Sequence, residues 1–297
     1  MRILIFLLVG LLALPAQAAL KIFATVPEWG ALAREIGGDK VDVFVATNGL
    51  QDPHHIQARP SLIARARDAD LVVATGAELE VGWLPLIQRE SGNPRIQSGQ
   101  PGYFEAAAKM RMLEVPSRLD RADGDVHAAG NPHIQTDPRN FLLIGAPLAA
   151  RMAELAPADA KTFEANWKSF AERWRAAIAR WESRAAPLRG LPVAVQHKAF
   201  PYLEDWLGLK AVATLEPKPG VEPSVAYLGK LLAQVAAKPP KLVMRAAYQS
   251  PQASEWFARE AKVPVVVVPF TVGGSKRAND LFGLFDDTIE QLLRALQ

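Results

Sequence analysis

The sequence predicts an α/β protein of two lobes, each a small parallel β-sheet flanked by helices, joined by one long rigid helix. Short apolar or alternating segments recur between helical segments, at a spacing typical of βαβ units. The 297 residues exceed the roughly 100–200 residues of one typical domain, which favours two domains. A single long helical stretch separates the two alternating halves of the chain.

The first half is expected to hold four strands with helices between them. Gly37 and Gly38 end the first helix, and Pro60 with Ser61 begins the second. Residues 76–86 are interpreted as the mouth of a cleft. The expected strands are 20–25, 41–45, 70–75 and 110–115, and the expected helices are 27–36, 62–67 and 140–155.

The long helix is expected from residue 158 to about residue 186. Its bulky residues repeat three and four positions apart and form one apolar stripe, which indicates core packing. A helix of about 28 residues is about 42 Å long, enough to lie along two lobes. The stripe consists of Phe163, Trp167, Phe170, Trp174, Ile178 and Trp181.

The second half repeats the alternation of strands and helices after Pro187. The expected strands are 193–196, 210–214, 241–245 and 265–268, and the expected helices are 200–207, 224–237, 251–261 and 279–296. The chain is therefore divided into an N-terminal lobe of residues 19–156, a linking helix of residues 157–187 and a C-terminal lobe of residues 188–297.

Residues 1–18 are typical of a secretory signal peptide. A basic start precedes an apolar run, and Ala16-Gln17-Ala18 supplies the pattern of small residues at a cleavage site. The sequence contains no cysteine, which excludes disulfides, thiolate metal ligands and the cysteine of a lipid anchor. We therefore expect an exported protein, soluble in the periplasm after cleavage.

The charge pattern argues against nucleic-acid binding. The formal net charge is only +3, and lysines and arginines are interleaved with acids without a basic block.

The five histidines lie in three places, which points to a metal site. His54 and His55 follow the second expected strand, His127 and His133 flank a Gly-Asn-Pro turn, and His197 follows the first strand of the second half. Ligands of open α/β sheets bind outside the carboxyl ends of the strands, and imidazole nitrogen suits Zn²⁺. Any one histidine alone could simply bond a loop carbonyl.

Four motifs together resemble the periplasmic zinc- and manganese-binding receptors of ABC uptake transporters. They are Asp52-Pro53-His54, Asn131-Pro132-His133 with Asp137-Pro138-Arg139-Asn140, His197-Lys198-Ala199-Phe200-Pro201-Tyr202, and Gly220-Val221-Glu222-Pro223-Ser224. The resemblance covers essentially the whole chain after the signal peptide. It implies a metal held between two lobes by His54, His133 and His197, and an inner-membrane ABC permease as partner.

The chain departs from the family at the fourth ligand. Many members carry an aspartate after the last strand, where this chain reads Val268-Pro269-Phe270-Thr271-Val272. Asp280 is the candidate substitute, although it could instead be an ordinary N-terminal helix acid; Glu222 and Glu255, earlier in the chain, are the other candidates. For His55 and His127 we expect accessory or loop roles, and Asp125 with His127 could capture metal transiently.

Three histidines favour Zn²⁺ as the transported ligand over Mn²⁺, which prefers oxygen ligands. The alternatives are a manganese receptor, a metallochaperone of the same fold, and a zinc hydrolase with three histidine ligands. No His-Glu-x-x-His, Gly-x-Ser-x-Gly or Walker motif is present, so no enzyme activity is expected. We expect a monomer whose partners are the permease, the metal ion and a loading chaperone.

Overall fold

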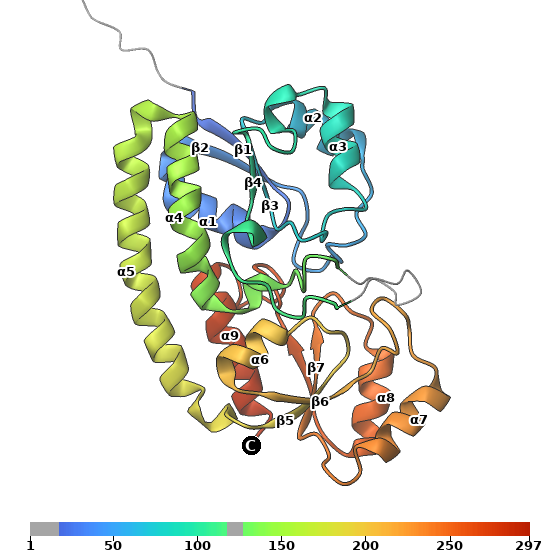
Figure 1. The fold of residues 1–297 in the computed structure, drawn as a ribbon. Coiled ribbons are helices and arrows are strands. Elements are labelled where there is room, and N and C mark those ends of the chain that lie inside the picture. Colours follow the sequence, from blue (N-terminus) through green and yellow to red (C-terminus); the bar gives the residue numbers. More distant parts are fainter. Residues whose placement is uncertain (1–17, 118–126) are drawn as a thin grey trace, which may run out of the picture.

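Two four-stranded parallel sheets, connected by a long helix, make up the computed structural model (Figure 1). The structure describes residues 18–117 and 127–297. The predicted signal peptide lies outside these residues, apart from Ala18. No helix among the described residues has the length and apolar character needed to span a membrane.

The first sheet has the strand order β2-β1-β3-β4. Its strands are β1 (Leu20–Ala24), β2 (Val41–Val45), β3 (Leu71–Ala74) and β4 (Tyr103–Glu105). Helix α1 (Pro27–Gly37) and the long helices cover one face of this sheet, and α2 (Pro60–Asp68) and α3 (Leu84–Ser91) cover the other. A separate cluster of buried apolar side chains lies on each face. The predictions for the first three strands and for the first two helices are confirmed.

The predicted fourth strand at residues 110–115 is wrong. The strand that pairs with β3 is Tyr103–Glu105, and it has only three residues. The backbone of Leu113 instead forms its hydrogen bonds outside the sheet. Its N–H donates to the Tyr202 hydroxyl at 3.0 Å, and its carbonyl accepts from Asn131 N at 2.8 Å. Apolar composition alone could not distinguish such an extended loop from a strand.

Helix α3 was absent from the sequence prediction, which placed a cleft mouth over residues 76–86. The signals were present, because Pro85 lies in the first turn of α3 and Gly92 ends it in the left-handed conformation. Trp83 is fully buried in the apolar cluster below α2 and α3.

The long helix α5 (Ala160–Arg184) has 25 residues and follows α4 (Pro138–Leu155), against which it packs. The predicted stripe is confirmed as core, since all its members are buried except Trp167, which is partly buried. The Trp174 ring lies 4.9 Å from Phe282 and 5.6 Å from Phe285, both in α9 (Leu281–Arg294). Figure 1 shows α5 running beside both sheets.

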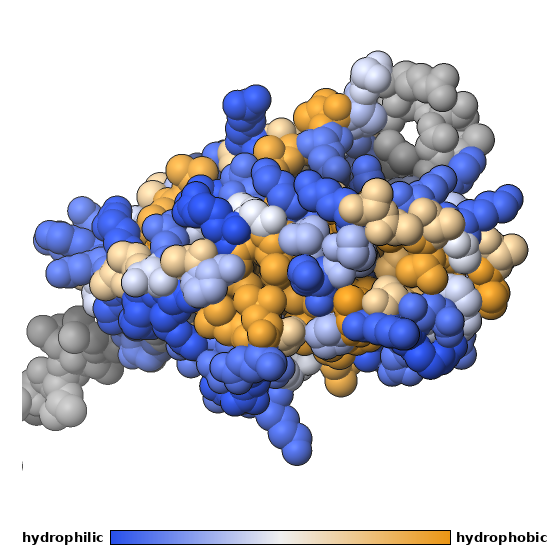
Figure 2. Space-filling model, turned by 90° about the horizontal axis from the view of Figure 1, so that it is seen from below, coloured by the Kyte–Doolittle hydropathy of each residue, from blue (hydrophilic) through white to orange (hydrophobic). Residues whose placement is uncertain are grey.

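The second sheet has the strand order β6-β5-β7-β8. Its strands are β5 (Pro192–Val195), β6 (Lys210–Thr214), β7 (Leu242–Ala246) and β8 (Val265–Val268), and its remaining helices are α6 (Pro201–Leu207), α7 (Val225–Gln234) and α8 (Gln252–Ala261). The predicted elements of this half are confirmed in type and order. Seen from below, the molecule presents mostly hydrophilic residues, with some apolar ones near the middle (Figure 2).

One continuous cluster of buried apolar side chains runs from the first sheet through α4, α5 and α9 to the second sheet. The lobes are therefore packed on a shared core. The residue at which one lobe ends and the other begins stays a prediction.

Candidate metal centre

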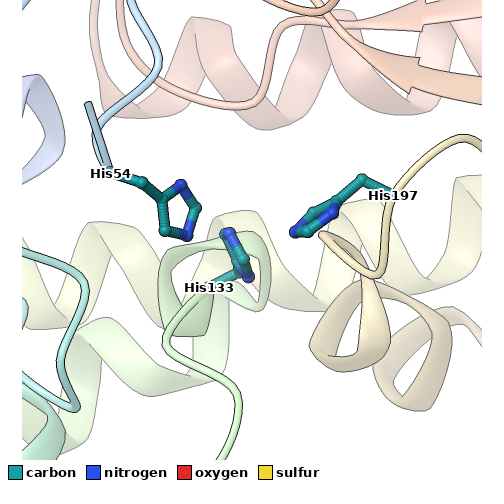
Figure 3. A group of neighbouring side chains, drawn as sticks. All are labelled: His54, His133 and His197. Atoms are coloured by element: carbon teal, nitrogen blue, oxygen red, sulfur yellow. The ribbon is translucent and has the colours of Figure 1, made fainter. Parts of the chain in front are cut away.

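His54, His133 and His197 come together between the two sheets (Figure 3). His54 lies in the loop after β2, His133 precedes the short 3₁₀ helix η5 (Ile134–Thr136), and His197 is the second residue after β5. One ring nitrogen of each lies within 4.8 Å of the other two. Tetrahedral coordination with Zn–N bonds of about 2.0–2.1 Å needs separations of about 3.3 Å, so small movements suffice.

Each of these histidines is oriented by a hydrogen-bond acceptor at Nδ1. His54 Nδ1 lies 2.8 Å from Asp52 Oδ1, His133 Nδ1 lies 2.8 Å from Asn131 Oδ1, and His197 Nδ1 lies 2.7 Å from Glu216 Oε2. Carboxylate oxygens accept, so Nδ1 of His54 and His197 carries the proton. In the neutral ring Nε2 is then left with a lone pair.

The orientation of the Asn131 amide is fixed by its neighbours. Its Nδ2 donates to the Lys198 carbonyl at 2.7 Å, which can only accept, and its Oδ1 also accepts from His133 N at 3.0 Å. The amide oxygen therefore faces the His133 ring, and His133 Nδ1 is the donor.

Nε2 of His54 and of His133 is buried and has no hydrogen-bond partner among the described residues. A buried polar atom left without a partner costs roughly 1–3 kcal/mol. Burial, together with the neighbouring histidines, lowers the pKa of His133 well below its usual range. The ring is therefore neutral near pH 7, and a neutral imidazole is the form that binds metal.

The loop that carries His54 is anchored by the residue that precedes α3. Trp83 Nε1 donates to the Pro53 carbonyl at 2.9 Å, and Asp52 Oδ1 also accepts from His54 N at 3.0 Å. Trp83 therefore holds this loop in position.

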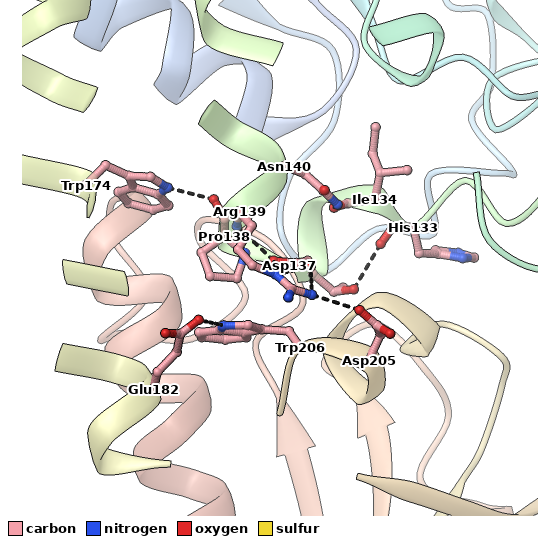
Figure 4. A network of polar contacts seen from close by, with 11 residues as sticks. His133, Ile134, Asp137, Pro138, Arg139, Asn140, Trp174, Glu182, Asp205 and Trp206 are labelled. Carbon is pink, nitrogen blue, oxygen red and sulfur yellow. Dashed lines mark hydrogen bonds and ion pairs between the residues drawn. The ribbon is translucent and has the colours of Figure 1, made fainter. Parts of the chain in front are cut away.

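The segment after His133 is held by three polar contacts (Figure 4). Thr136 Oγ1 donates to the His133 carbonyl at 2.9 Å, and Asn140 Nδ2 donates to the Ile134 carbonyl at 2.7 Å. Asp137 caps α4 by accepting from Arg139 N at 2.8 Å. The same short stretch therefore carries His133 and begins helix α4, so its motif contains both a turn and a helix cap.

Two hollows open onto the histidine group. One, of about 200 Å³, is lined by His54 and His197 with Asp52, Glu216 and Gln196. The other, of about 240 Å³, is lined by His133 and His197 with His127, Glu114 and Lys198. The histidine group therefore lies between two hollows.

A family model described as zinc-uptake complex component A, periplasmic (ZnuA), matches residues 22–295. The chain belongs to this family.

Individual relatives agree with that assignment. The high-affinity zinc uptake system protein ZnuA of Paracoccus denitrificans (strain Pd 1222) is 23% identical over 261 residues, 76% of each chain. A crystal structure of ZnuA superposes with a TM-score of 0.78 at 22% identity, covering 94% of this chain and 100% of the other. The solute-binding protein FpvC of Pseudomonas aeruginosa, in complex with Mn²⁺, gives a TM-score of 0.76 at 26% identity, covering 94% and 98%.

The position at which the family resemblance leads us to expect an aspartate is apolar in this chain. The Phe270 ring lies 5.5 Å from the His133 ring, and Val272 packs against the core. Thr271 donates through Oγ1 to Glu28, a contact between the two lobes. No carboxylate among the described residues joins the three histidines within ligand distance.

Asp280 is not brought to the histidine group. It caps α9, accepting from Gly283 N at 2.7 Å, and it lines a separate hollow with Arg34 and Asn48. It therefore takes the helix-terminal role that its sequence position also allowed.

The accessory histidines lie close to His54. The His127 ring stacks on it at 5.4 Å with an angle of 28°, and the His55 ring lies 6.2 Å away. Each lines one of the two hollows. Asp125 lies outside the residues that the structure describes.

Sequence reasoning gave no role to the three acceptors of Nδ1, and it never singled out Glu216. Asp52 and Asn131 each precede their histidine by two residues, a spacing that lets a short side chain reach back to the ring. Glu216 follows the carboxyl end of β6, so the rule that located His197 also locates this acid.

Proposed function

We propose that this protein binds Zn²⁺ with Nε2 of His54, His133 and His197 and delivers it to an ABC permease. The observation that carries the proposal is the convergence of three imidazoles whose Nδ1 atoms are already bonded. Burying two Nε2 atoms without a partner is costly, and a bound cation removes that cost. Membership of the ZnuA family supplies the transport role.

Zinc is favoured over manganese by the donor set. Imidazole nitrogen suits Zn²⁺, whereas Mn²⁺ prefers carboxylate and water oxygens. Asp52 and Glu216 place negative charge behind two of the rings, which compensates the ion's charge without entering its coordination sphere. The Mn²⁺ complex of FpvC keeps manganese as the second candidate.

The receptor role implies a location and a partner for the chain. We propose that residues 1–18 direct export, that the protein acts in the periplasm, and that an inner-membrane permease receives the metal. The N-terminal lobe (19–156) supplies His54 and His133, and the C-terminal lobe (188–297) supplies His197. A metal bound by all three ties the lobes together, and no chemistry is carried out on it.

Metal content tests the binding proposal directly. Protein purified without added metal or chelator should carry about one zinc per chain by inductively coupled plasma mass spectrometry. His133→Ala should lose it, whereas His55→Ala, which removes a neighbouring histidine outside the group, should keep it. Zinc retained by His133→Ala, or no zinc in the unmodified protein even after titration, would contradict the site.

Delivery is tested separately with the reconstituted permease. Zinc-loaded protein should stimulate its ATPase activity, and loaded His55→Ala should do so equally. Stoichiometric zinc binding without stimulation would leave a metallochaperone as the better description.

A further inference from the structure

The hollow beside His54 and His197 contains a buried side chain that the three-histidine site does not use. Gln196 immediately precedes His197, is only 3% exposed and lines this hollow. Its Oε1 is buried and has no hydrogen-bond partner among the described residues.

The orientation of the Gln196 amide is determined. Nε2 donates to the Ser250 carbonyl at 2.9 Å, and a carbonyl can only accept, so the oxygen occupies the other position. The backbone of Gln196 is also fixed, because its N–H donates to Met244 O at 2.9 Å and its carbonyl accepts from Glu216 N at 3.0 Å. Oε1 is therefore a rigidly placed acceptor, and leaving it unpaired costs roughly 1–3 kcal/mol.

A water in the hollow that Gln196 lines would supply the donor that Oε1 lacks. A volume of about 200 Å³ has room for several waters of about 30 Å³ each. The two carboxylates nearest the histidines, Asp52 and Glu216, already bond the rings through Nδ1. Neither can move to a metal without releasing its histidine.

We propose that Gln196 Oε1 accepts a hydrogen bond from a water molecule that fills the fourth coordination position of the bound metal. The inference rests on the proposed function. His54 and His197 both face this hollow, so an ion held by them is open to it, and three histidines leave one position of a tetrahedral zinc site for solvent. The neutral amide orients that water without adding charge, which keeps the ion releasable.

Two substitutions test the role of Gln196. Gln196→Leu removes the acceptor at similar volume, and zinc affinity, measured by competition with a chromophoric chelator, should fall roughly 10- to 100-fold. Gln196→Glu keeps an acceptor oxygen at the same place, and its affinity should not fall below that of the unmodified protein.

Gln135→Leu is the matched control. Gln135 follows His133 by two residues, is 2% exposed and also has an unpaired buried Oε1, but it lines neither hollow beside the histidines. Its substitution should leave zinc affinity within about twofold of the unmodified protein, because a residue that lines neither hollow is not coupled to the metal site.

A measurement specific to the metal-bound water tests whether Gln196 positions that water or only packs beside the site. In Co²⁺-loaded protein, thiocyanate replaces metal-bound water and changes the visible absorption spectrum. Gln196→Leu should bind thiocyanate more tightly than the unmodified protein, because the displaced water has lost its acceptor, and Gln196→Glu should bind it more weakly.

The outcomes distinguish the two proposals. Equal zinc and thiocyanate affinities in Gln196→Leu and the unmodified protein would overturn the role of Gln196 and leave the three-histidine site intact. Failure of the unmodified protein to bind zinc or cobalt would overturn the proposed function, and this inference with it.

Discussion

Arg139 Nη2 donates to Asp205 Oδ2 at 2.8 Å and so joins the segment after His133 to the helix after His197 (Figure 4). The same guanidinium bonds both oxygens of Asp137, the cap of α4. Asp137 is buried and Asp205 is exposed. One arginine therefore bridges the two segments that position two of the proposed ligands.

Arg139→Ala should destabilise the protein more than Asp205→Ala. Removing Arg139 leaves the buried Asp137 carboxylate without its charged partner, at a cost of roughly 1–3 kcal/mol. Removing Asp205 breaks an exposed ion pair, worth about 0–1 kcal/mol. Urea unfolding of the three proteins measures both changes, and equal losses would contradict this division of roles.

Glu28 should make stability depend on pH. It is fully buried in α1, and burial raises its pKa from 4.5 to about 7, although the bond from Thr271 opposes the change. A carboxyl whose pKa is raised on folding stabilises the protein fully below pH 4.5 and loses that contribution as pH rises to about 7. The difference corresponds to roughly 3 kcal/mol.

Glu28→Gln isolates this effect, because the amide keeps the size of the side chain but does not ionise. Unfolding free energies of the variant and the unmodified protein, measured from pH 4 to pH 8, should diverge in favour of the variant as pH rises and become parallel above pH 7. A difference that does not change with pH would show that Glu28 does not titrate in this range.

Glu216→Gln should weaken zinc binding although Glu216 is not a proposed ligand. It bonds His197 Nδ1 at 2.7 Å and accepts from Gly220 N at 2.9 Å, so it fixes the ring and the loop beside it. The amide of glutamine carries no negative charge, and mutating an acceptor behind a ligand ring typically costs 10–100-fold in metal affinity. Glu222→Gln is the control, since Glu222 lines the same hollow and is exposed; equal effects would point to general electrostatics.

Metal binding should leave the overall dimensions nearly unchanged. The apolar cluster that passes through α4, α5 and α9 is shared by both sheets, so wide hinge opening would expose buried aromatic rings such as Trp174 and Phe285. Release is expected to depend on small tilts and loop changes. Small-angle X-ray scattering should give the same radius of gyration with and without zinc, and a clear decrease on loading would favour a hinge.

Strand and helix periodicity located most of the fold from sequence because the buried segments are long enough to show it. It failed at β4, whose three residues carry no measurable period, and at α3, where Glu78, Glu80 and Trp83 suggested the mouth of a cleft. The three histidines were located by their positions after strands and by motif. The acceptors behind them were not, because Glu216 and His197 meet only when β5 and β6 pair.

Asp280 illustrates the remaining limit. An acid before a helix is equally consistent with a cap and with a ligand, and only the three-dimensional distance to the histidines separates the two. The structure places it in the cap. Phe270 against His133 likewise could not be read from sequence, because the contact depends on how the loop after β8 turns.

Zinc K-edge X-ray absorption of the protein loaded with one equivalent of zinc tests the three-histidine site most directly. We expect three imidazole nitrogens at about 2.0–2.1 Å and one further light-atom ligand, with one imidazole lost in His133→Ala. A spectrum with fewer than three imidazoles in the unmodified protein, or one unchanged by His133→Ala, would contradict it.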